Sequence, residues 1–201
     1  MTEKQSLRLI LPLERLPAFS LFLQQGVWLQ VQTGCSVADL LTDQFGIAED
    51  YIVERITTLF LDFKPIDDLK TSYVNDGSTL ALSSAMPGLV GTTMRRGSHL
   101  AAMRGDISCK DQQRIESGIG RIRIKLFNLV MTELGAIFLG HGVCLSSAEL
   151  DNFLSAQDDG FLAGRGAAFW GDLPLDFTSL IKRVRGADPD AEILLKVEFT
   201  G

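Results

Sequence analysis

Residues 88–97 bring together the kinds of groups that bind anions. Glycine-rich backbone exposes amide N–H groups, and guanidinium groups form paired hydrogen bonds with phosphate and carboxylate oxygens. One hypothesis is therefore an anion site in this segment. The other is a solvated turn that follows a strand, and the lack of a Walker Lys-Ser/Thr ending and of a following helix favours the turn. The candidate anion-binding residues are Gly88, Gly91, Thr92, Arg95 and Arg96.

Residues 160–171 form a second glycine-rich segment, which also carries aromatic side chains. A dinucleotide-binding fingerprint needs a strand before it and a helix after it, and the sequence provides neither here. We therefore interpret the segment as an interface or packing loop in which aromatic side chains serve as anchors. Residues 19–23 are also more apolar than a solvated connection requires. The candidate interface residues are Phe22, Phe169 and Trp170.

The histidines and cysteines are too few and too scattered to predict a metal site. His141 and Cys144 lie three residues apart, whereas the other histidine and the other two cysteines are distant in sequence. A structural zinc ion needs a complete tetrahedral set of ligands, so we expect no metal and a structural role for His141 at the end of a helix. The acidic pairs at residues 67–68 and 158–159 are typical of solvated turns. The sequence thus offers no catalytic residues and predicts no cofactor.

Composition predicts a folded protein and argues against non-specific binding to polyanions, and it leaves open a local basic patch. Apolar residues make up 46% of the chain and charged residues 22%, as in ordinary globular proteins. The net charge is −6 and the sequence pI is about 4.9, which argues against nucleic acid and anionic membranes as partners. No signal peptide is visible, and the most apolar window, residues 126–145, contains Asn128, Glu133 and His141, so we expect a buried helix there. We expect a cytoplasmic protein whose partner is another protein or a second copy of itself.

The first ninety or so residues have the pattern of a small α+β domain. Apolar residues alternate with polar ones at residues 7–11 and 27–31, which predicts two opening strands. Ser36 is placed to cap a helix over residues 36–45, and Gly46 is placed to end it. Further strands are predicted at residues 56–63 and 79–83, the second of them after the Asn75-Asp76-Gly77 turn.

A family resemblance rests on residues 59–91, LFLDFKPIDDLKTSYVNDGSTLALSSAMPGLVG. There an apolar strand, an Asp-Gly turn, a second alternating strand and a Pro-Gly-x-x-Gly end follow one another. Together with the helix at residues 36–45, this segment resembles the β-grasp (ubiquitin-like) sulfur-carrier family, which includes the small subunit of molybdopterin synthase and the thiamine-biosynthesis carrier. The resemblance covers residues 1–91 and implies a β-grasp fold for that part of the chain.

The same segment differs from that family at its end, which is where the family members carry out their chemistry. Family members end in Gly-Gly, and their terminal carboxylate is adenylated and converted to a thiocarboxylate. This chain has Gly88-Leu89-Val90-Gly91 instead and continues to residue 201. Sulfur carriage would require cleavage near Gly88 or Gly91, and we favour the interpretation that the fold serves binding.

The second half of the chain is predicted to be a further α+β domain of unknown type. Basic and apolar residues alternate over residues 119–126, which predicts a strand with one basic and one apolar face. Helices are expected at residues 129–138, from Ser146 or Ser147 onward, and at residues 175–184. A last strand is expected at residues 193–199. This last strand is a candidate partner for residues 119–126. The predicted domains are residues 1–95 and 119–201, joined by a connector at residues 96–118.

Two functions remain open at this stage. The first is a non-enzymatic protein-binding or scaffold protein, which the missing catalytic residues and the aromatic segments favour. The alternative is a sulfur-carrier or cofactor-metabolism protein that uses residues 88–97, either as a processed tail or as an anion site.

Overall fold

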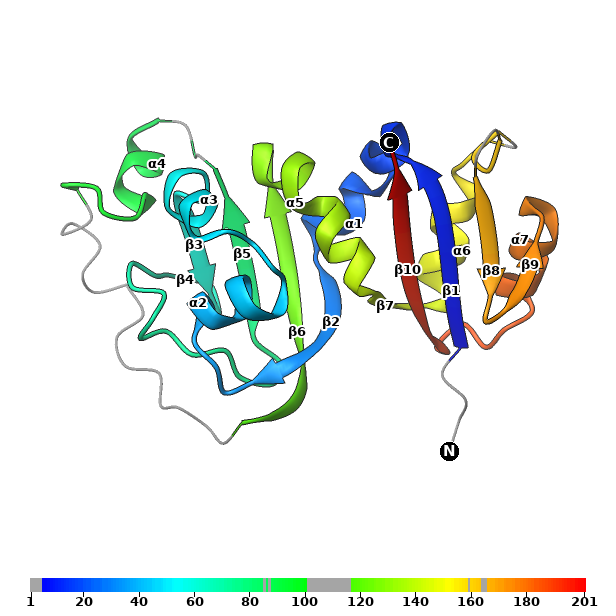
Figure 1. Cartoon of the computed structure of the whole chain (residues 1–201), viewed down its shortest axis with the longest axis horizontal. Coiled ribbons are helices and arrows are strands. Elements are labelled where there is room, and N and C mark those ends of the chain that lie inside the picture. Colours follow the sequence, from blue (N-terminus) through cyan, green and yellow to red (C-terminus); the bar gives the residue numbers. More distant parts are fainter. Residues whose placement is uncertain (1–4, 85, 87, 101–116, 159, 164–165) are drawn as a thin grey trace. The chain divides into compact units, whose positions relative to one another are not determined.

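Ten strands and seven α-helices make up the described part of this mixed α+β protein, which confirms the predicted class. The structure is a computed structural model that describes residues 5–84, 86, 88–100, 117–158, 160–163 and 166–201 (Figure 1). The chain forms two compact units. Unit 1 combines Met1–Ser20 with Ala136–Gly201, and unit 2 is Leu21–Gly135, so the units do not follow the predicted domain boundaries.

Unit 1 contains a mixed sheet in which the two ends of the chain lie side by side. Its strands lie in the order β7-β10-β1-β8-β9, with β1 and β10 parallel and the other neighbours antiparallel. The strands are β1 (Gln5–Pro12), β7 (Val143–Ser146), β8 (Ala167–Trp170), β9 (Leu173–Leu175) and β10 (Glu192–Thr200).

The partners of β1 and β10 correct two predictions. The first strand was predicted to lie in one domain with residues 27–31, and the last strand was a candidate partner for residues 119–126. Instead β1 and β10 pair with each other from Gln5↔Ile193 to Pro12↔Thr200. The alternating pattern fixes which face of a strand is buried, and it does not encode the partner strand, so both errors arose at the same step.

The core of unit 1 contains a cluster of phenylalanines. Phe19 is fully buried, and its ring centroid lies 4.8 Å from that of Phe153 and 6.4 Å from that of Phe161. Phe19 ends the 3-10 helix η1 (Leu13–Phe19), which is continued by α1 (Ser20–Gln25). The apolar segment predicted at residues 19–23 therefore contributes its first residue to this core.

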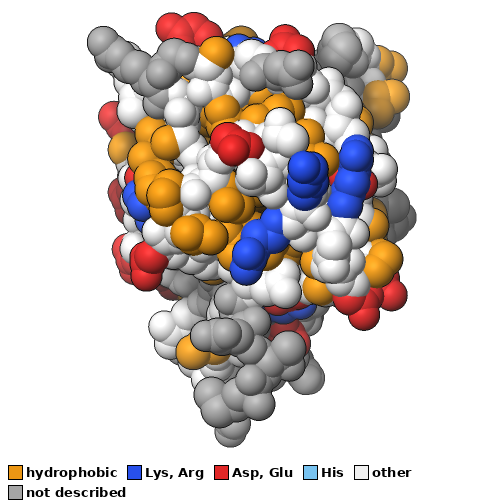
Figure 2. All heavy atoms as spheres, turned by 90° about the vertical axis from the view of Figure 1, so that its right-hand side faces the viewer, with side chains coloured by type: hydrophobic (Ala, Val, Ile, Leu, Met, Phe, Trp, Pro, Cys, Tyr) orange, Lys and Arg blue, Asp and Glu red, His pale blue; other side chains and the backbone are white. Residues whose placement is uncertain are grey.

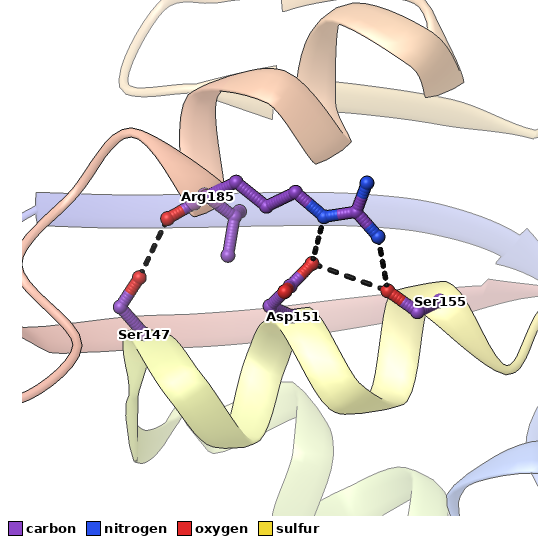
Figure 3. Close-up of polar contacts among 5 residues, drawn as sticks. Ser147, Asp151, Ser155 and Arg185 are labelled. Atoms are coloured by element: carbon purple, nitrogen blue, oxygen red, sulfur yellow. Dashed lines mark hydrogen bonds and ion pairs between the residues drawn. The ribbon is translucent and has the colours of Figure 1, made fainter.

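Helices α6 (Ser147–Ser155) and α7 (Phe177–Arg185) are joined by polar contacts (Figure 3). The Arg185 guanidinium donates to the Asp151 carboxylate at 2.9 Å and to the Ser155 hydroxyl at 2.8 Å. The buried Ser147 hydroxyl donates to the Val184 carbonyl at 2.8 Å. As predicted, α6 begins with a capping box, because Ser146 and Glu149 bond to each other's backbone amides.

The strands of unit 2 are also mixed in direction, and they lie in the order β4-β3-β5-β6-β2. Strands β5 and β6 are parallel, and every other neighbouring pair is antiparallel. The predicted strands at residues 56–63, 79–83 and 119–126 are confirmed. The strands are β2 (Val27–Thr33), β3 (Thr58–Leu61), β4 (Lys64–Pro65), β5 (Thr79–Ser83) and β6 (Gly118–Phe127).

The first helix after β2 begins where the sequence predicts it. The Ser36 hydroxyl accepts a hydrogen bond from the Asp39 amide at 3.1 Å, and Gly46 has a φ of 67° after the helix ends. The helix begins as α2 (Val37–Asp39) and continues as the π-helix η2 (Leu40–Gln44). The remaining helices are α3 (Glu49–Glu54) and α4 (Gly88–Met94), and α5 (Asn128–His141) runs from unit 2 into unit 1.

Helix α5 occupies the apolar window at residues 126–145, as expected for a buried helix. Its inward side chains Val130, Leu134, Phe138 and Leu139 are at most 4% exposed. None of the helices in the described ranges combines the length and the apolar character needed to cross a membrane.

Candidate functional site

A pocket of about 650 Å³ lies in unit 2, where four separate segments of the chain meet. This volume is in the range of sites that hold a small molecule or a few side chains of a partner. One wall is formed by Ala38 and Thr42 of the α2–η2 helix, and another by Glu49, Ile52 and Val53 of α3. Residues 67–70 and residues 96–98 complete the lining.

The loop at residues 67–72 is held against the start of α2 by main-chain hydrogen bonds. The Val37 amide donates to the Ser72 carbonyl at 2.8 Å, and the Ala38 amide donates to the Leu69 carbonyl at 3.0 Å. These bonds satisfy amides that a helix otherwise leaves free in its first turn. Consequently, the amides of Val37 and Ala38 do not serve as an anion site, although they lie beside the pocket.

The pocket combines an apolar floor with a rim of both charge signs. Ile52 and Leu69 are nearly fully buried at 4% and 8% exposure, whereas Val53 is 67% exposed at the rim. Among the lining residues, Glu49, Asp67 and Asp68 are acidic, and Lys70 and Arg96 are basic. The Asp68 carboxylate accepts the Lys70 amide at 2.8 Å, and this bond lowers the pKa of Asp68.

Arg96 is the member of the predicted anion-binding set that reaches this pocket. Its amide donates to the Thr57 carbonyl at 2.8 Å, and its guanidinium donates to the Ile52 carbonyl at 3.0 Å. Burial lowers the pKa of Arg96, and the negative charge of Asp67 acts in the opposite direction. An arginine stays protonated in such a place, so it brings a fixed positive charge to the wall beside α3.

The other predicted anion-binding residues lie in or just after a helix, where a loop was expected. Gly88, Gly91 and Thr92 belong to α4, and the Thr92 hydroxyl donates back to the Gly88 carbonyl at 3.1 Å. Gly91 is buried, and a Cβ there would collide with the Met86 carbonyl group, so the position requires glycine. Arg95 is exposed. Only Arg96 of the five lines the pocket, and an anion site at these residues stays a prediction.

A second pocket, of about 320 Å³, surrounds Cys35 and shares Lys70 with the first. The Cys35 thiol donates to the Gln32 carbonyl at 3.2 Å, and the Gln44 amide donates to the Cys35 sulfur at 3.3 Å. Burial raises the pKa of Cys35, and the nearby charge of Asp39 adds to the increase. A nucleophilic cysteine needs a lowered pKa, and that of Cys35 is raised instead.

The predicted interface residues Phe169 and Trp170 lie in strand β8, and not in a loop. Each is half-buried, and they point to opposite faces of the sheet because successive strand residues alternate. The guanidinium of Arg8 lies 4.4 Å from the Phe169 ring centroid, and that of Arg183 lies 5.3 Å from the Trp170 ring centroid. Phe22, in α1, is also half-buried.

The β9 and α7 side of unit 1 carries exposed apolar and basic side chains together. Figure 2 shows hydrophobic side chains gathered on this face, with Lys and Arg side chains among them. Leu173 in β9 is 53% exposed, and the last turn of α7 contains Lys182, Arg183 and Arg185. This composition is compatible with an interface, and the interface itself stays a prediction.

His141 and Cys144, the two residues considered as a metal or nucleophile pair, lie at the end of α5 and in β7. His141 is the last residue of α5, as predicted, and burial lowers its pKa, as does the charge of Lys196. Cys144 is buried in β7, and neither it nor Cys35 forms a disulfide with another described residue. Within the described ranges no three histidine, cysteine or acidic side chains converge to hold a metal ion. Cys109 lies outside those ranges.

Comparison with known proteins adds no relative to this picture. The chain matches no protein-family model, no curated protein and no solved structure.

Most of the large pocket was missed by sequence reasoning because its lining comes from four segments. The acidic pair at residues 67–68 was noticed only as a turn, and Lys70, Ile52 and Val53 were not selected at all. Val53 is a signal that could have indicated this surface. It is an apolar residue on the outer side of a short helix, and the residue after it, Glu54, is charged.

Proposed function

We propose that this protein is a non-enzymatic binding protein whose unit 2 receives a segment of a partner protein in the large pocket. The observation that carries the proposal is the lining of that pocket. Its floor is apolar and its rim carries charges of both signs. Such a surface provides affinity through apolar burial and orientation through charge, without chemistry on the bound group.

We also propose that unit 2 is a β-grasp domain with a permuted strand order. A β-grasp sheet has its first and last strands parallel and adjacent, its second strand beside the first, and its third beside the last. Strands β6, β2, β3 and β5 take those four places in unit 2, and the helices between β2 and β3 take the place of the β-grasp helix. The strand in the first place comes last along the chain, and β1 belongs to unit 1.

The rim indicates what the partner segment is like. An apolar side chain fits against Ile52 and Leu69, and the acidic Asp67 and Asp68 accept a basic neighbour on the same segment. Lys70 and Arg96 accept an acidic one. A peptide with one large apolar residue between residues of opposite charge satisfies all three requirements.

The experiment that tests this function is a comparison of two exposed substitutions. Val53→Glu places a carboxylate at the pocket rim, and we expect it to weaken partner capture by about tenfold or more, because charge in an apolar interface is costly. Leu129→Glu is the matched control, because Leu129 is 53% exposed and does not line the pocket. Proteins captured from the native cells by each variant are quantified against the parent.

Two outcomes would contradict the proposal. One is equal loss of captured proteins with both variants, which would indicate a non-specific effect of added charge. The other is unchanged capture with Val53→Glu, provided that the thermal unfolding of the variant matches that of the parent.

The alternative function is a sulfur carrier or a cofactor-metabolism protein that uses residues 88–97. The presence of Arg96 in the pocket supports the version that binds an anionic metabolite. A processed tail is less well supported, because Gly91 is packed within α4 against Met86. Intact mass spectrometry of protein from native cells separates these possibilities: a fragment ending at Gly88 or Gly91, heavier by the exchange of oxygen for sulfur, would establish the carrier.

A further inference from the structure

One face of the unit 2 sheet carries a row of basic side chains. Along β6, Ile122, Ile124 and Leu126 are fully buried, so the residues between them lie on the other face. Those residues are Arg121, Arg123 and Lys125, of which Arg121 is exposed and the other two are half-buried. Alternate side chains on one face of a strand are about 7 Å apart. The row is therefore a regularly spaced line of positive charge.

An aromatic ring lies beside this row on the neighbouring strand. Trp28 in β2 pairs with Arg123, so the two side chains share the face. The guanidinium carbons of Arg121 and Arg123 lie 5.7 Å and 6.0 Å from the centroid of the Trp28 ring. Arg123 also donates to the Gly26 carbonyl at 3.3 Å, which fixes its position next to the ring.

An apolar hollow of about 230 Å³ continues the same face beyond Lys125. Its lining includes the rings of Phe60 and Phe127 and the small side chain of Ala81. Ala81 pairs with Phe60 on one side and with Lys125 on the other, so the hollow adjoins the basic row. Asn128 lies at its edge and donates to the Ser83 hydroxyl at 3.0 Å.

We propose that this face of unit 2 binds a single-stranded nucleic acid, with the backbone along β6 and bases at Trp28 and in the hollow. Each nucleotide supplies one phosphate and one planar base, and the face offers cations flanked by aromatic rings on both sides. An acidic peptide matches the basic row but brings no planar group for each charge. Nucleic acid is therefore the occupant that accounts for both features.

This inference reverses the expectation drawn from the net charge. A net charge of −6 describes the whole chain, whereas binding depends on the local field at the surface that is contacted. Along β6 the local balance is positive, and Asp76, whose carboxylate accepts the Arg121 amide at 2.7 Å, marks the acidic end of the row. Arg123 and Lys125 are thus its cationic centre.

The test uses the full-length protein and a fluorescein-labelled oligouridylate, with anisotropy measured over a range of salt concentrations. We expect the Arg123→Gln, Lys125→Gln double variant to bind about tenfold or more weakly. Its salt dependence, the slope of log K against log salt, should fall by about 1.4, which is about 0.7 for each lost phosphate contact. The matched control is the Lys182→Gln, Arg183→Gln double variant, which removes the same amount of charge from α7. It should change the affinity and the salt slope only slightly.

Trp28→Leu provides an independent readout that charge loss does not mimic. It should weaken binding by roughly 5- to 150-fold, the range for removal of one stacking aromatic, with the salt slope unchanged. Should the double variant unfold because the Arg123 contact to Gly26 is lost, Lys125→Gln alone carries the charge test, with a slope change of about 0.7.

Three results would overturn the proposal. One is no binding of the oligouridylate by the parent protein at low salt. Another is an equal loss of affinity in the α7 control variant and in the β6 variant. The third is tighter binding of a glutamate-rich peptide of equal length, which would assign the face to an acidic protein segment.

Discussion

The Cys35 thiol lies in surroundings that disfavour its ionised form. Burial raises its pKa, and the charges of Asp39 and Asp43 act in the same direction. Only the thiolate attacks electrophiles, so a raised pKa makes the side chain a poor nucleophile at neutral pH. This chemistry agrees with a binding function for the surrounding pocket.

The raised pKa predicts slow alkylation of Cys35. In a Cys109→Ser background, we expect the iodoacetamide reaction at pH 8 to be slower than that of a free cysteine peptide, and to accelerate toward higher pH. Asp39→Asn removes one negative charge and should increase the rate by about two- to fivefold. Intact mass spectrometry follows the reaction over time. A rate faster than that of the free peptide would show an activated thiol and would favour catalysis.

At the scale of elements, local patterns predicted most of the helices and strands. The Ser36 cap, the left-handed Gly46, the strand over residues 79–83 and the basic and apolar faces of β6 depend on neighbours in sequence, and all are present. Pairing is different, because β1 finds its partner almost the whole chain away in β10. Such long-range choices depend on the complete core, and a single sequence does not display them.

The contacts between α6 and α7 predict which polar bond contributes more to the free energy of unfolding. Ser147 is 2% exposed, and its hydroxyl satisfies the Val184 carbonyl, so Ser147→Ala should lower the free energy of unfolding by about 1–3 kcal/mol. The Arg185 side chain is 56% exposed in its ion pair with Asp151, so Arg185→Ala should cost only about 0.2–1 kcal/mol.

Urea unfolding of both variants measures this difference directly (Figure 3). Ser155→Ala is a useful third variant, because it removes the hydroxyl that bonds to both Arg185 and Asp151 and leaves the ion pair between those two residues in place. A larger loss for Arg185→Ala than for Ser147→Ala would contradict the assignment of the buried hydroxyl as the stronger link.

At the scale of the whole molecule, the chain divides into one continuous and one discontinuous unit. Unit 2 is a single stretch, whereas unit 1 needs residues from both ends of the chain. In unit 1, β1 lies between β10 and β8 and supplies the buried Leu7, Leu9 and Leu11. Unit 1 therefore depends on its N-terminal strand for pairing and for core volume.

This arrangement predicts how fragments fold. Residues 21–135 should fold alone and give a cooperative unfolding transition, because the five strands β4-β3-β5-β6-β2 all lie within this one stretch of chain. Residues 136–201 alone should remain unfolded, because the strand between β10 and β8 is missing. Joining residues 1–20 to residues 136–201 through a flexible linker should restore folding. Circular dichroism and thermal unfolding of the three fragments decide the matter, and a cooperative transition for residues 136–201 alone would refute it.

The large pocket in unit 2 carries the central claim, and site-specific photocrosslinking in the native cells tests it most directly. A photoreactive phenylalanine analogue is placed at position 53, at the pocket rim, or at position 129, which is similarly exposed outside the pocket. The account predicts a discrete protein adduct that forms from position 53 and not from position 129. No adduct at position 53, or the same adducts from both positions, would contradict a partner-binding pocket.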